Sequence, residues 1–476
     1  MLFRHGHTTT CNLQHATCNN DNNMILLTGA TGLLGGHTLY ALLQKHERVA
    51  ALKREHSSVE GLREIFSFYT DHPDSLMERI EWRTGDMLDA DSLVRAMDGI
   101  TCVINCAAIV SFDPKDRNML IRNNVIGTKN LVHAMMDKTR DKRQETRDKR
   151  QETGDGRQET GDGREADMTS GLWSLDFCLI HVSSTSALGD SPGNDVKFLI
   201  DEETPRDLNR RHNGYSESKY GSEQIVWNAI EGHEGIRASG LKELPLAPGA
   251  ERRVERGLGG EADSASRITH HASRFPAIIL NPGIILGPGQ WTKGSSQLFR
   301  QAWEGLKYYP YGGTGYVDVR DVAEIIREMV EEVEEVEEVE NCKPKLINSS
   351  TSQLLGQRFC VVGANLRYKE FFDKVTDEFG KPNPYIYAGK FLSGLAWRAD
   401  TLKARLTGRY PLLTRDTAES AQRISFYSSE KIQQALDFKF RPIEETLDWV
   451  CSLYQTKDQR QETRGGRQET EDKRQE

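Results

Sequence analysis

Residues 28–36, Thr-Gly-Ala-Thr-Gly-Leu-Leu-Gly-Gly, contain four glycines and begin at the last residue of a short apolar run, Met24–Thr28. A helical pattern of leucines comes next. A strand, a Gly-x-x-Gly-x-x-Gly turn and a helix are typical of a dinucleotide site, because glycine permits the tight turn and the first helical N–H groups face the pyrophosphate. The residues expected to contact a dinucleotide at this turn are Gly29, Thr31, Gly32, Leu33, Leu34 and Gly35.

Apolar strand-like runs and helical patterns alternate farther along the chain. This alternation predicts an α/β protein whose parallel, Rossmann-type doubly wound sheet carries helices on both faces. The strand-like runs are Arg48–Leu52, Ile80–Thr84, Thr101–Ala107, Phe177–Ser184 and Ala277–Asn281. The helical patterns cover Asp91–Met97, Arg117–Met136 and Tyr215–Ile230.

Polar, low-complexity segments interrupt this alternation. Repeats of Arg-Gln-Glu-Thr fill about 138–170 and a Gly-rich polar stretch fills about 235–271. No repeat position is apolar, so there is no coiled-coil seam, and we expect solvated surface insertions, with a partner-binding role for the repeats as the alternative. The domains expected are a disordered extension (1–23), an NAD(P)-binding domain (24–329, with a substrate-lobe segment at about 289–315), an acidic insert (330–356), a C-terminal lobe segment (357–455) and a disordered tail (456–476).

Charge and composition exclude several classes of protein. The net charge of -9 argues against a nucleic-acid binder, and no apolar run reaches the roughly 18 residues that a membrane span needs. The N-terminal segment lacks a secretory pattern. We therefore expect a cytoplasmic protein with a small-molecule substrate and no nucleic-acid or membrane partner. The eight cysteines are expected to be buried free thiols, and Cys11 and Cys18 match no zinc template, so no metal is expected.

The ends of the next strands bear on the choice of cofactor. The second run ends in Lys53 and Arg54, where NAD-binding proteins carry a carboxylate for the ribose hydroxyls. A cation can pair with the 2′-phosphate, so Arg54 favours NADP over NAD. Asp86 is placed to accept from the adenine amino group, the alternative being a turn or helix-cap aspartate. Further cofactor contacts are expected from Met87, Cys106, Ala107 and Ala108.

A catalytic group is expected from Tyr215, Lys219 and Ser184. Tyr215 and Lys219 are four residues apart on a helix and share a face. The ammonium should lower the tyrosine pKa, so that the phenol can exchange a proton with a carbonyl oxygen as hydride moves. Ser184 ends a strand and could hydrogen-bond the same oxygen. Asn124, on an earlier helix, could hold Lys219 through water; a structural helix pair is the alternative interpretation of Tyr215 and Lys219.

The order of these motifs resembles the extended short-chain dehydrogenase/reductase family, in its epimerase/dehydratase branch with dihydroflavonol-reductase-like and 3β-hydroxysteroid-dehydrogenase-like members. The resemblance covers residues 24–454 apart from the inserts. It implies a Rossmann domain with a smaller C-terminal substrate lobe, NAD(P)-dependent chemistry on CH–OH or carbonyl groups, and compatibility with a homodimer. The residues that it implies are the triad Ser184, Tyr215 and Lys219 with Asn124 as a fourth member, and Tyr215, Lys219, Pro282 and Gly283 beside the cofactor.

Two departures from the family pattern concern the reaction. Asn281 stands where arginine is frequent, which puts contacts from that position in doubt. Thr185 and Ser186 follow Ser184 where sugar-nucleotide dehydratases carry an Asp-Glu pair, which argues against dehydration.

Aromatic residues in the expected lobe bear on the substrate. A lining of such side chains suits an apolar or ring-shaped carbonyl compound, whereas packing of the lobe core is the other interpretation. The leading expectation is reduction of a ketone or aldehyde, or oxidation of the alcohol. The alternatives are an NAD-dependent sugar-nucleotide epimerase and a non-catalytic NAD(P)-binding regulatory or assembly protein. The aromatic residues are Trp291, Phe299, Trp303, Tyr308, Tyr309 and Tyr311.

Overall fold

A computed structural model describes residues 24–152, 177–232, 275–292, 294–334, 349–389, 392–394, 397–398 and 414–458. The N-terminal extension, the insert at 235–271, most of the repeats and nearly all of the tail lie outside these ranges, and so do Cys11 and Cys18. Within the described residues, no helix is long and apolar enough to cross a membrane.

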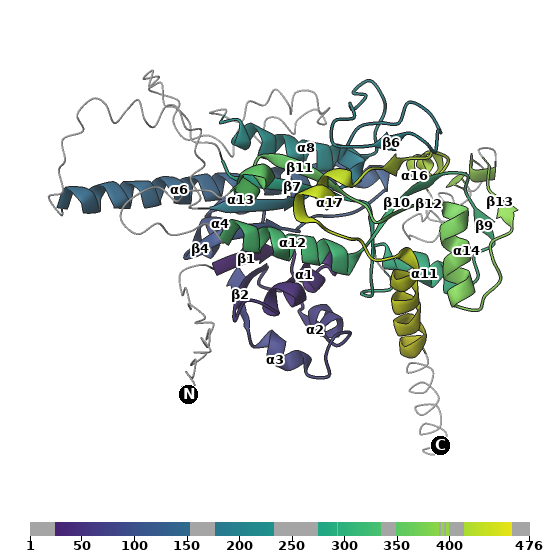
Figure 1. Cartoon of the computed structure of the whole chain (residues 1–476), viewed down its shortest axis with the longest axis horizontal. Helices are drawn as coiled ribbons and strands as arrows, with labels where there is room; N and C mark the ends of the chain where they lie inside the picture. The colour runs from purple at the N-terminus through teal and green to yellow at the C-terminus, as the bar shows by residue number, and fades with distance from the viewer. Residues whose placement is uncertain are drawn as a thin grey trace, which may run out of the picture.

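A seven-stranded sheet forms the centre of the molecule, in the order β11-β7-β5-β4-β1-β2-β3, and every neighbouring pair is parallel (Figure 1). The predicted doubly wound fold is confirmed. The order reverses between β1 and β4, and a crevice at the carboxyl ends of such strands is where α/β sheets bind ligands. The strands are β1 (Met24–Thr28), β2 (Val49–Lys53), β3 (Ile80–Thr84), β4 (Ile100–Asn105), β5 (Cys178–Val182), β7 (Ala277–Pro282) and β11 (Gln357–Val361).

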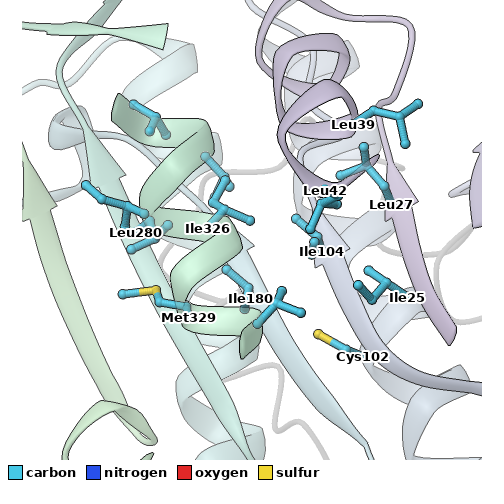
Figure 2. Close-up of a cluster of buried hydrophobic side chains, with 14 of the residues drawn as sticks. Ile25, Leu27, Leu39, Leu42, Cys102, Ile104, Ile180, Leu280, Ile326 and Met329 are labelled. Carbon is cyan, nitrogen blue, oxygen red and sulfur yellow. The ribbon is translucent and has the colours of Figure 1, made fainter. Parts of the chain in front are cut away.

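One face of the sheet is covered by α1 and α12. Figure 2 shows Leu39 and Leu42 of α1 and Ile326 and Met329 of α12 above apolar strand residues such as Ile104. These side chains are almost completely buried and form one continuous core. The helices on this face are α1 (Leu33–Leu43), α2 (Glu60–Phe66), α3 (Pro73–Met77), α12 (Val319–Glu334), α13 (Ser349–Leu354) and α17 (Glu430–Leu436).

The opposite face carries the helix on which Tyr215 and Lys219 lie. Val226 of this helix, α8, packs with Leu131 and Val132 of α6 against Val103 and Leu179 of the sheet. Burial of these apolar residues fixes α8 on this face of the sheet. The elements here are α4 (Ala90–Ala96), η1 (Pro114–Asp116), α5 (Arg117–Leu120), the π-helical turn η2 (Ile121–Ile126), α6 (Gly127–Glu152), the turn η3 (Thr185–Ala187) and α8 (Gly214–Ile230).

Three boundaries differ from the sequence predictions. Helix α6 continues to Glu152, into the repeats that were expected to be disordered (Figure 1). Lysine, arginine, glutamine and glutamate are good helix formers, so a core helix can extend through them into solvent. Val330, assigned to the acidic insert, is buried in the core on α12. Residues 357–361, assigned to the lobe, form β11, which pairs with β7 at the edge of the main sheet.

A smaller lobe follows the sheet and contains most of the remaining elements (Figure 1). Its core contains Phe299, which contacts Phe371, and Trp303, which contacts Phe379. The elements are β6 (Leu199–Ile200), β8 (Ile284–Leu286), α11 (Ser296–Trp303), β9 (Tyr308–Tyr309), β10 (Gly313–Asp318), β12 (Ala364–Arg367), α14 (Tyr368–Glu378), β13 (Ile386–Tyr387), α16 (Arg415–Ser420), β14 (Phe426–Tyr427) and a C-terminal helix over residues 443–458.

The aromatic residues of the lobe do not all line a pocket, as one of the two interpretations required. Trp291 and Phe299 are buried, and Trp291 and Trp303 pack against Tyr454 of the C-terminal helix. For these three residues the core-packing interpretation is correct, because the lobe needs large apolar side chains to hold its helices together. Tyr308 and Tyr311 are exposed.

Candidate active site

The glycine turn lies at the crevice between β1 and β4. Gly29 has φ +73°, and a Cβ there would lie 2.7 Å from the backbone nitrogen of Ala107. A Cβ on Gly35 would collide with the Gly29 carbonyl oxygen, so α1 can approach β1 only with glycine there. Gly32 is exposed and N-caps α1, and no side chain of the described residues caps this end. The first amides of α1, with Thr31, Leu33 and Leu34 around them, are therefore available to a phosphate.

A chain of polar groups joins the ends of β1, β4 and β5. The Thr28 hydroxyl donates to Asn105 Oδ1 at 2.7 Å and accepts from the Ala107 N–H at 3.2 Å. The Asn105 Nδ2 lies 3.1 Å from His181 Nδ1. These contacts, which were not predicted, hold residues 106–108 in place, with Cys106 and Ala107 partly exposed and Ala108 exposed. Polar residues at the ends of adjacent apolar strands were the signal in the sequence.

Arg54 is exposed directly after β2, and among the described residues it has no ion-pair partner. Its neighbour Lys53 places Nζ 5.4 Å from the ring centroid of Trp82. Asp86 accepts from the Leu88 N–H at 2.9 Å, which is the turn role considered as the alternative. One oxygen is enough for that turn, so the adenine contact remains a prediction, as does contact by the partly exposed Met87.

The three predicted catalytic residues lie together at the carboxyl end of β5. Ser184 caps the turn η3, where its hydroxyl accepts from the Ser186 N–H at 3.2 Å. The Ser184 side chain also interacts with the Tyr215 phenol. Lys219, one turn after Tyr215 on α8, donates from Nζ to the Val182 carbonyl at 3.0 Å.

The expected effect of Lys219 on the Tyr215 pKa is wrong for this arrangement. Burial raises the pKa of Tyr215, and only the Ser184 hydroxyl opposes this. The Lys219 ammonium is directed to a strand carbonyl. Burial also lowers the pKa of Lys219 to about 8, although Cys106 and Glu223 act to raise it. Tyr215 is therefore protonated at neutral pH, as a general acid must be.

Asn124 does not contact Lys219 directly. Its Nδ2 donates to the Ile109 carbonyl and to the Ser218 hydroxyl, both at 2.9 Å, and its Oδ1 accepts from the Ile109 N–H at 2.8 Å. The side chain thus links η2, the segment after β4 and the catalytic helix. Both the oxygen and the nitrogen of the Asn124 amide are therefore hydrogen-bonded to groups around the site. The predicted water link from Asn124 to Lys219 stays a prediction.

Arg206 ties the serine turn to the catalytic helix. It donates from Nη1 to the Ser186 carbonyl at 2.9 Å and from Nη2 to the Ser216 hydroxyl at 2.7 Å. The Ser216 hydroxyl itself donates to the Ser186 carbonyl at 2.7 Å. The guanidinium also lies 4.7 Å from the ring centroid of Tyr220. Arg206 was not predicted, because it stands in a polar loop with no pattern of its own.

The end of β7 packs closely on the lobe. A Cβ on Gly283 would lie 2.5 Å from the Gly315 carbonyl oxygen, so glycine is needed there. Pro282 is buried beside it at the end of the strand. Asn281, flagged as a departure from the family, donates to the Ser184 carbonyl at 2.9 Å. Pro282 and Gly283 thus lie near the catalytic serine, although their contact with a cofactor remains a prediction.

Apolar side chains flank Tyr215 on its other side. The Phe112 ring lies 5.6 Å from the Tyr215 ring and is 44% exposed, and Val110 is 54% exposed. Thr414, which caps α16, donates to the Phe112 carbonyl at 3.1 Å. Exposed apolar groups beside a catalytic hydroxyl can contact a substrate.

A cavity of about 930 Å³ lies between residues 191–194 and α16. Arg210 and Arg415 are paired with Asp190 and Glu419. Among the described residues, no group of three His, Cys, Asp or Glu side chains could hold a metal ion. The arginines that line the cavity are Arg210, Arg398, Arg415 and Arg423.

Comparison with known proteins agrees with this geometry. Residues 25–243 match the NAD dependent epimerase/dehydratase family. This part of the chain is similar to that family. The similarity agrees with the glycine turn and the Rossmann sheet, and the family's description names NAD.

Relatives and solved structures extend the likeness. Sterol demethylase protein B of Methylococcus capsulatus is 36% identical over 107 residues, 22% of this chain and 29% of the relative. A 3 beta-hydroxysteroid dehydrogenase/Delta 5-->4-isomerase of Mycobacterium tuberculosis is 30% identical over 116 residues, 23% of this chain and 27% of the relative. The chain thus matches less than a third of the length of either relative.

Solved structures share the fold. The crystal structure of gox2253 is 22% identical, with a TM-score of 0.58 over 91% of this chain and 98% of that chain. A dTDP-glucose 4,6-dehydratase from Bacillus anthracis, solved in complex with NAD, is 14% identical, with a TM-score of 0.52 over 92% of this chain and 97% of that chain. At these identities the likeness concerns the fold alone.

Proposed function

We propose that the protein is an NADP-dependent oxidoreductase that reduces a ketone or aldehyde of a small apolar or ring-shaped molecule, or oxidises the corresponding alcohol. The observation that carries the proposal is the meeting of Ser184, Tyr215 and Lys219 at the carboxyl end of β5, beside the glycine turn. A non-catalytic binding protein would have no need of a phenol, a hydroxyl and an ammonium at that place.

The residues have distinct roles in this proposal. The first amides of α1 would hold the pyrophosphate and Arg54 the 2′-phosphate of the cofactor, which supplies hydride when bound. Tyr215 donates its phenolic proton to the substrate oxygen as negative charge develops there. Ser184 donates a hydrogen bond to the same oxygen. The Lys219 ammonium, which donates to the Val182 carbonyl, does not ionise Tyr215 beforehand; its role is to supply positive charge on the same face of α8 once the proton has left.

The substrate class is inferred from Phe112 and Val110. Both are apolar and exposed, and the Phe112 ring contacts the ring of Tyr215. A ring-shaped or aliphatic ketone could cover these side chains while its oxygen reaches the Tyr215 hydroxyl. Removing such apolar surface from water contributes about 25 cal/mol for each Å² buried.

The first test is a titration of the purified protein with NADPH and NADH, followed by protein fluorescence. We expect NADPH to bind more tightly than NADH. We also expect members of a panel of cyclic and aliphatic ketones to be reduced with consumption of NADPH. Binding of NADPH without turnover on any member of the panel would support a regulatory or assembly role instead. Binding of neither nucleotide would overturn the proposal.

The arginine-lined cavity favours a second candidate, an NAD-dependent sugar-nucleotide epimerase. Two arginines of the cavity, Arg398 and Arg423, have no ion-pair partner among the described residues, and such cations suit a diphosphate better than an apolar ring. This candidate expects NAD to be retained on purification and UDP- or GDP-sugars to raise the melting temperature. A protein that prefers NADPH and is not stabilised by nucleotide sugars would contradict it.

A further inference from the structure

Glu223 is a fully buried carboxylate beside the catalytic residues. It lies on α8, one turn after Lys219, with an exposed fraction of 0%. A buried charge is strongly unfavourable unless other groups face it, so its neighbours indicate its role. The neighbours come from four parts of the fold: Lys219 from the same helix, Ser183 directly after β5, Asn281 from β7 and Arg358 from β11.

The first link runs from Glu223 to the catalytic serine. Asn281 Nδ2 donates to Glu223 Oε1 at 2.5 Å and to the Ser184 carbonyl at 2.9 Å. Asn281 is itself fully buried in β7. The carboxylate therefore fixes the amide, and the amide fixes the backbone of the residue whose hydroxyl meets Tyr215.

The second link is electrostatic. Arg358 Nη1 lies 3.6 Å from Glu223 Oε2, and another nitrogen of Arg358 donates to the Glu202 carbonyl, which holds the guanidinium in place. Arg206 also interacts electrostatically with the carboxylate. Burial raises the pKa of Glu223, whereas its contacts with Ser183 and Asn281 and the charges of Arg358 and Lys219 oppose this rise and favour the ionised form.

Four groups of the described residues face the ammonium of Lys219. The groups that face its ammonium are the Val182 carbonyl, Cys106 at the end of β4, His181 on β5 and Glu223. Burial alone would favour loss of its proton. The pKa of the Cys106 thiol is raised to about 12, so this thiol is neutral at ordinary pH and Glu223 is the carboxylate among these groups.

We propose that Glu223 is a positioning residue of the active site, which holds the Ser184 backbone through Asn281 and keeps Lys219 protonated through its charge. This inference rests on the proposed function, because the positioning matters for catalysis only if Ser184 and Lys219 act as proposed. Arg358 is part of the same arrangement, because its charge opposes the protonation of the Glu223 carboxylate that burial favours.

The test measures the proton affinity of Lys219 and requires no substrate. The full-length protein is labelled with acetic anhydride over a series of pH values, and acetylation of Lys219 is quantified by mass spectrometry. Glu223→Gln keeps the size of the side chain and one oxygen acceptor but removes the charge. The midpoint of Lys219 labelling should fall by about one pH unit, a tenfold change in its dissociation constant.

Two further substitutions test whether a shift of the labelling midpoint is specific to the charge of Glu223. Glu217→Gln removes another carboxylate of α8, one paired with Arg117 at 2.6 Å, and should leave the midpoint unchanged. Arg358→Met should lower the midpoint as Glu223→Gln does, since the unpaired carboxylate takes up a proton, and Arg358→Lys should restore it. Arg358→Met also serves if the Glu223 variant fails to fold.

The outcomes separate this inference from the proposed function. An unchanged midpoint in folded Glu223→Gln or Arg358→Met would overturn the inference, even where NADPH binds and ketones are reduced. Faster labelling at every pH without a shift of the midpoint would mean a merely structural role and would overturn it too. Failure of the wild-type protein to bind NADPH would contradict the proposed function but leave the labelling result valid.

Discussion

The ring of Phe112 meets the ring of Tyr215 edge-on, with centroids 5.6 Å apart and planes at 68°. Phe112 is 44% exposed, so the contact leaves much of its ring open beside the catalytic phenol. A residue that packs on the proposed general acid and also faces solvent would influence both the position of Tyr215 and the molecules that reach it.

Phe112→Ala should therefore weaken the binding of apolar substrates. We expect KM for the best cyclic ketone to rise roughly tenfold, about 1.4 kcal/mol of lost contact, with a smaller change in kcat. Steady-state kinetics with NADPH would measure this. Leu208→Ala, which removes an exposed apolar side chain elsewhere, serves as the control. An unchanged KM would mean that the substrate does not cover Phe112.

Tyr215→Phe should abolish turnover, with a loss of at least about 10²-fold, because the substrate oxygen receives no proton. NADPH affinity should stay close to that of the wild-type protein, since only one hydroxyl is removed. Fluorescence titration and an NADPH-consumption assay give the two values. Tyr220→Phe, on the same helix, is the matched control and should stay active. Persistent activity of the Tyr215 variant would remove Tyr215 from the role of general acid.

Arg54→Gln should weaken NADPH binding roughly tenfold or more and leave NADH binding unchanged. A charge-assisted hydrogen bond contributes about 1.5–3 kcal/mol, and NADH lacks the phosphate that would receive it. The titration proposed above measures both affinities. Arg63→Gln removes a cation of α2 that is already paired with Asp74, and should change neither. An equal loss for both nucleotides would argue against a contact with the 2′-phosphate.

Much of the fold was predictable because local signals agreed with the tertiary structure. The strand runs at 24–28 and 80–84 match β1 and β3, since short apolar runs ended by turn residues have few alternatives. The common location of Ser184, Tyr215 and Lys219 could be predicted because each follows from the order of strand, turn and helix, and their catalytic role stays a prediction.

Other features depend on contacts that a single sequence does not contain. Residues 357–361 join the main sheet only through pairing with β7, and no local pattern indicates a partner. The partnership of Glu223 with Arg358 joins residues far apart in the chain, although a glutamate four residues after Lys219 on an apolar face was a signal. The pKa of Tyr215 was predicted to be lowered, whereas burial raises it. The sequence does not show that this side chain is buried.

Arg206→Met should lower kcat by about 10–100-fold through misplacement of Ser184, since one guanidinium holds both the η3 turn and Ser216. NADPH affinity should change little. Arg206→Lys should recover only part of the activity, because an ammonium cannot reproduce the planar fork that spans the two groups. Kinetics and titration on both variants would check this. Full activity of the Met variant would show that the turn holds its shape without Arg206.

His37 should make the protein sensitive to acid. It is 1% exposed, with Nδ1 2.5 Å from the Tyr69 hydroxyl and Nε2 2.9 Å from the Pro288 carbonyl, which accepts from it. Burial lowers its pKa from 6.5 to about 4, while the bond to Pro288 opposes this. The unfolded chain therefore binds more protons than the folded one between these values, so stability is fully present above pH 6.5 and falls as the pH drops towards 4. The shift corresponds to about 3 kcal/mol.

Urea unfolding at pH 7 and pH 4 measures this dependence. His37→Gln retains one donor and one acceptor but does not titrate, so the variant should lose about 3 kcal/mol less than the wild-type protein over this range. His56→Gln, at an exposed position, should behave like the wild-type protein. If His37→Gln and the wild-type protein lose equal stability, His37 is not buried in its neutral form. The junction that it forms between α1 and the segment after β8 would then have to be held by other contacts.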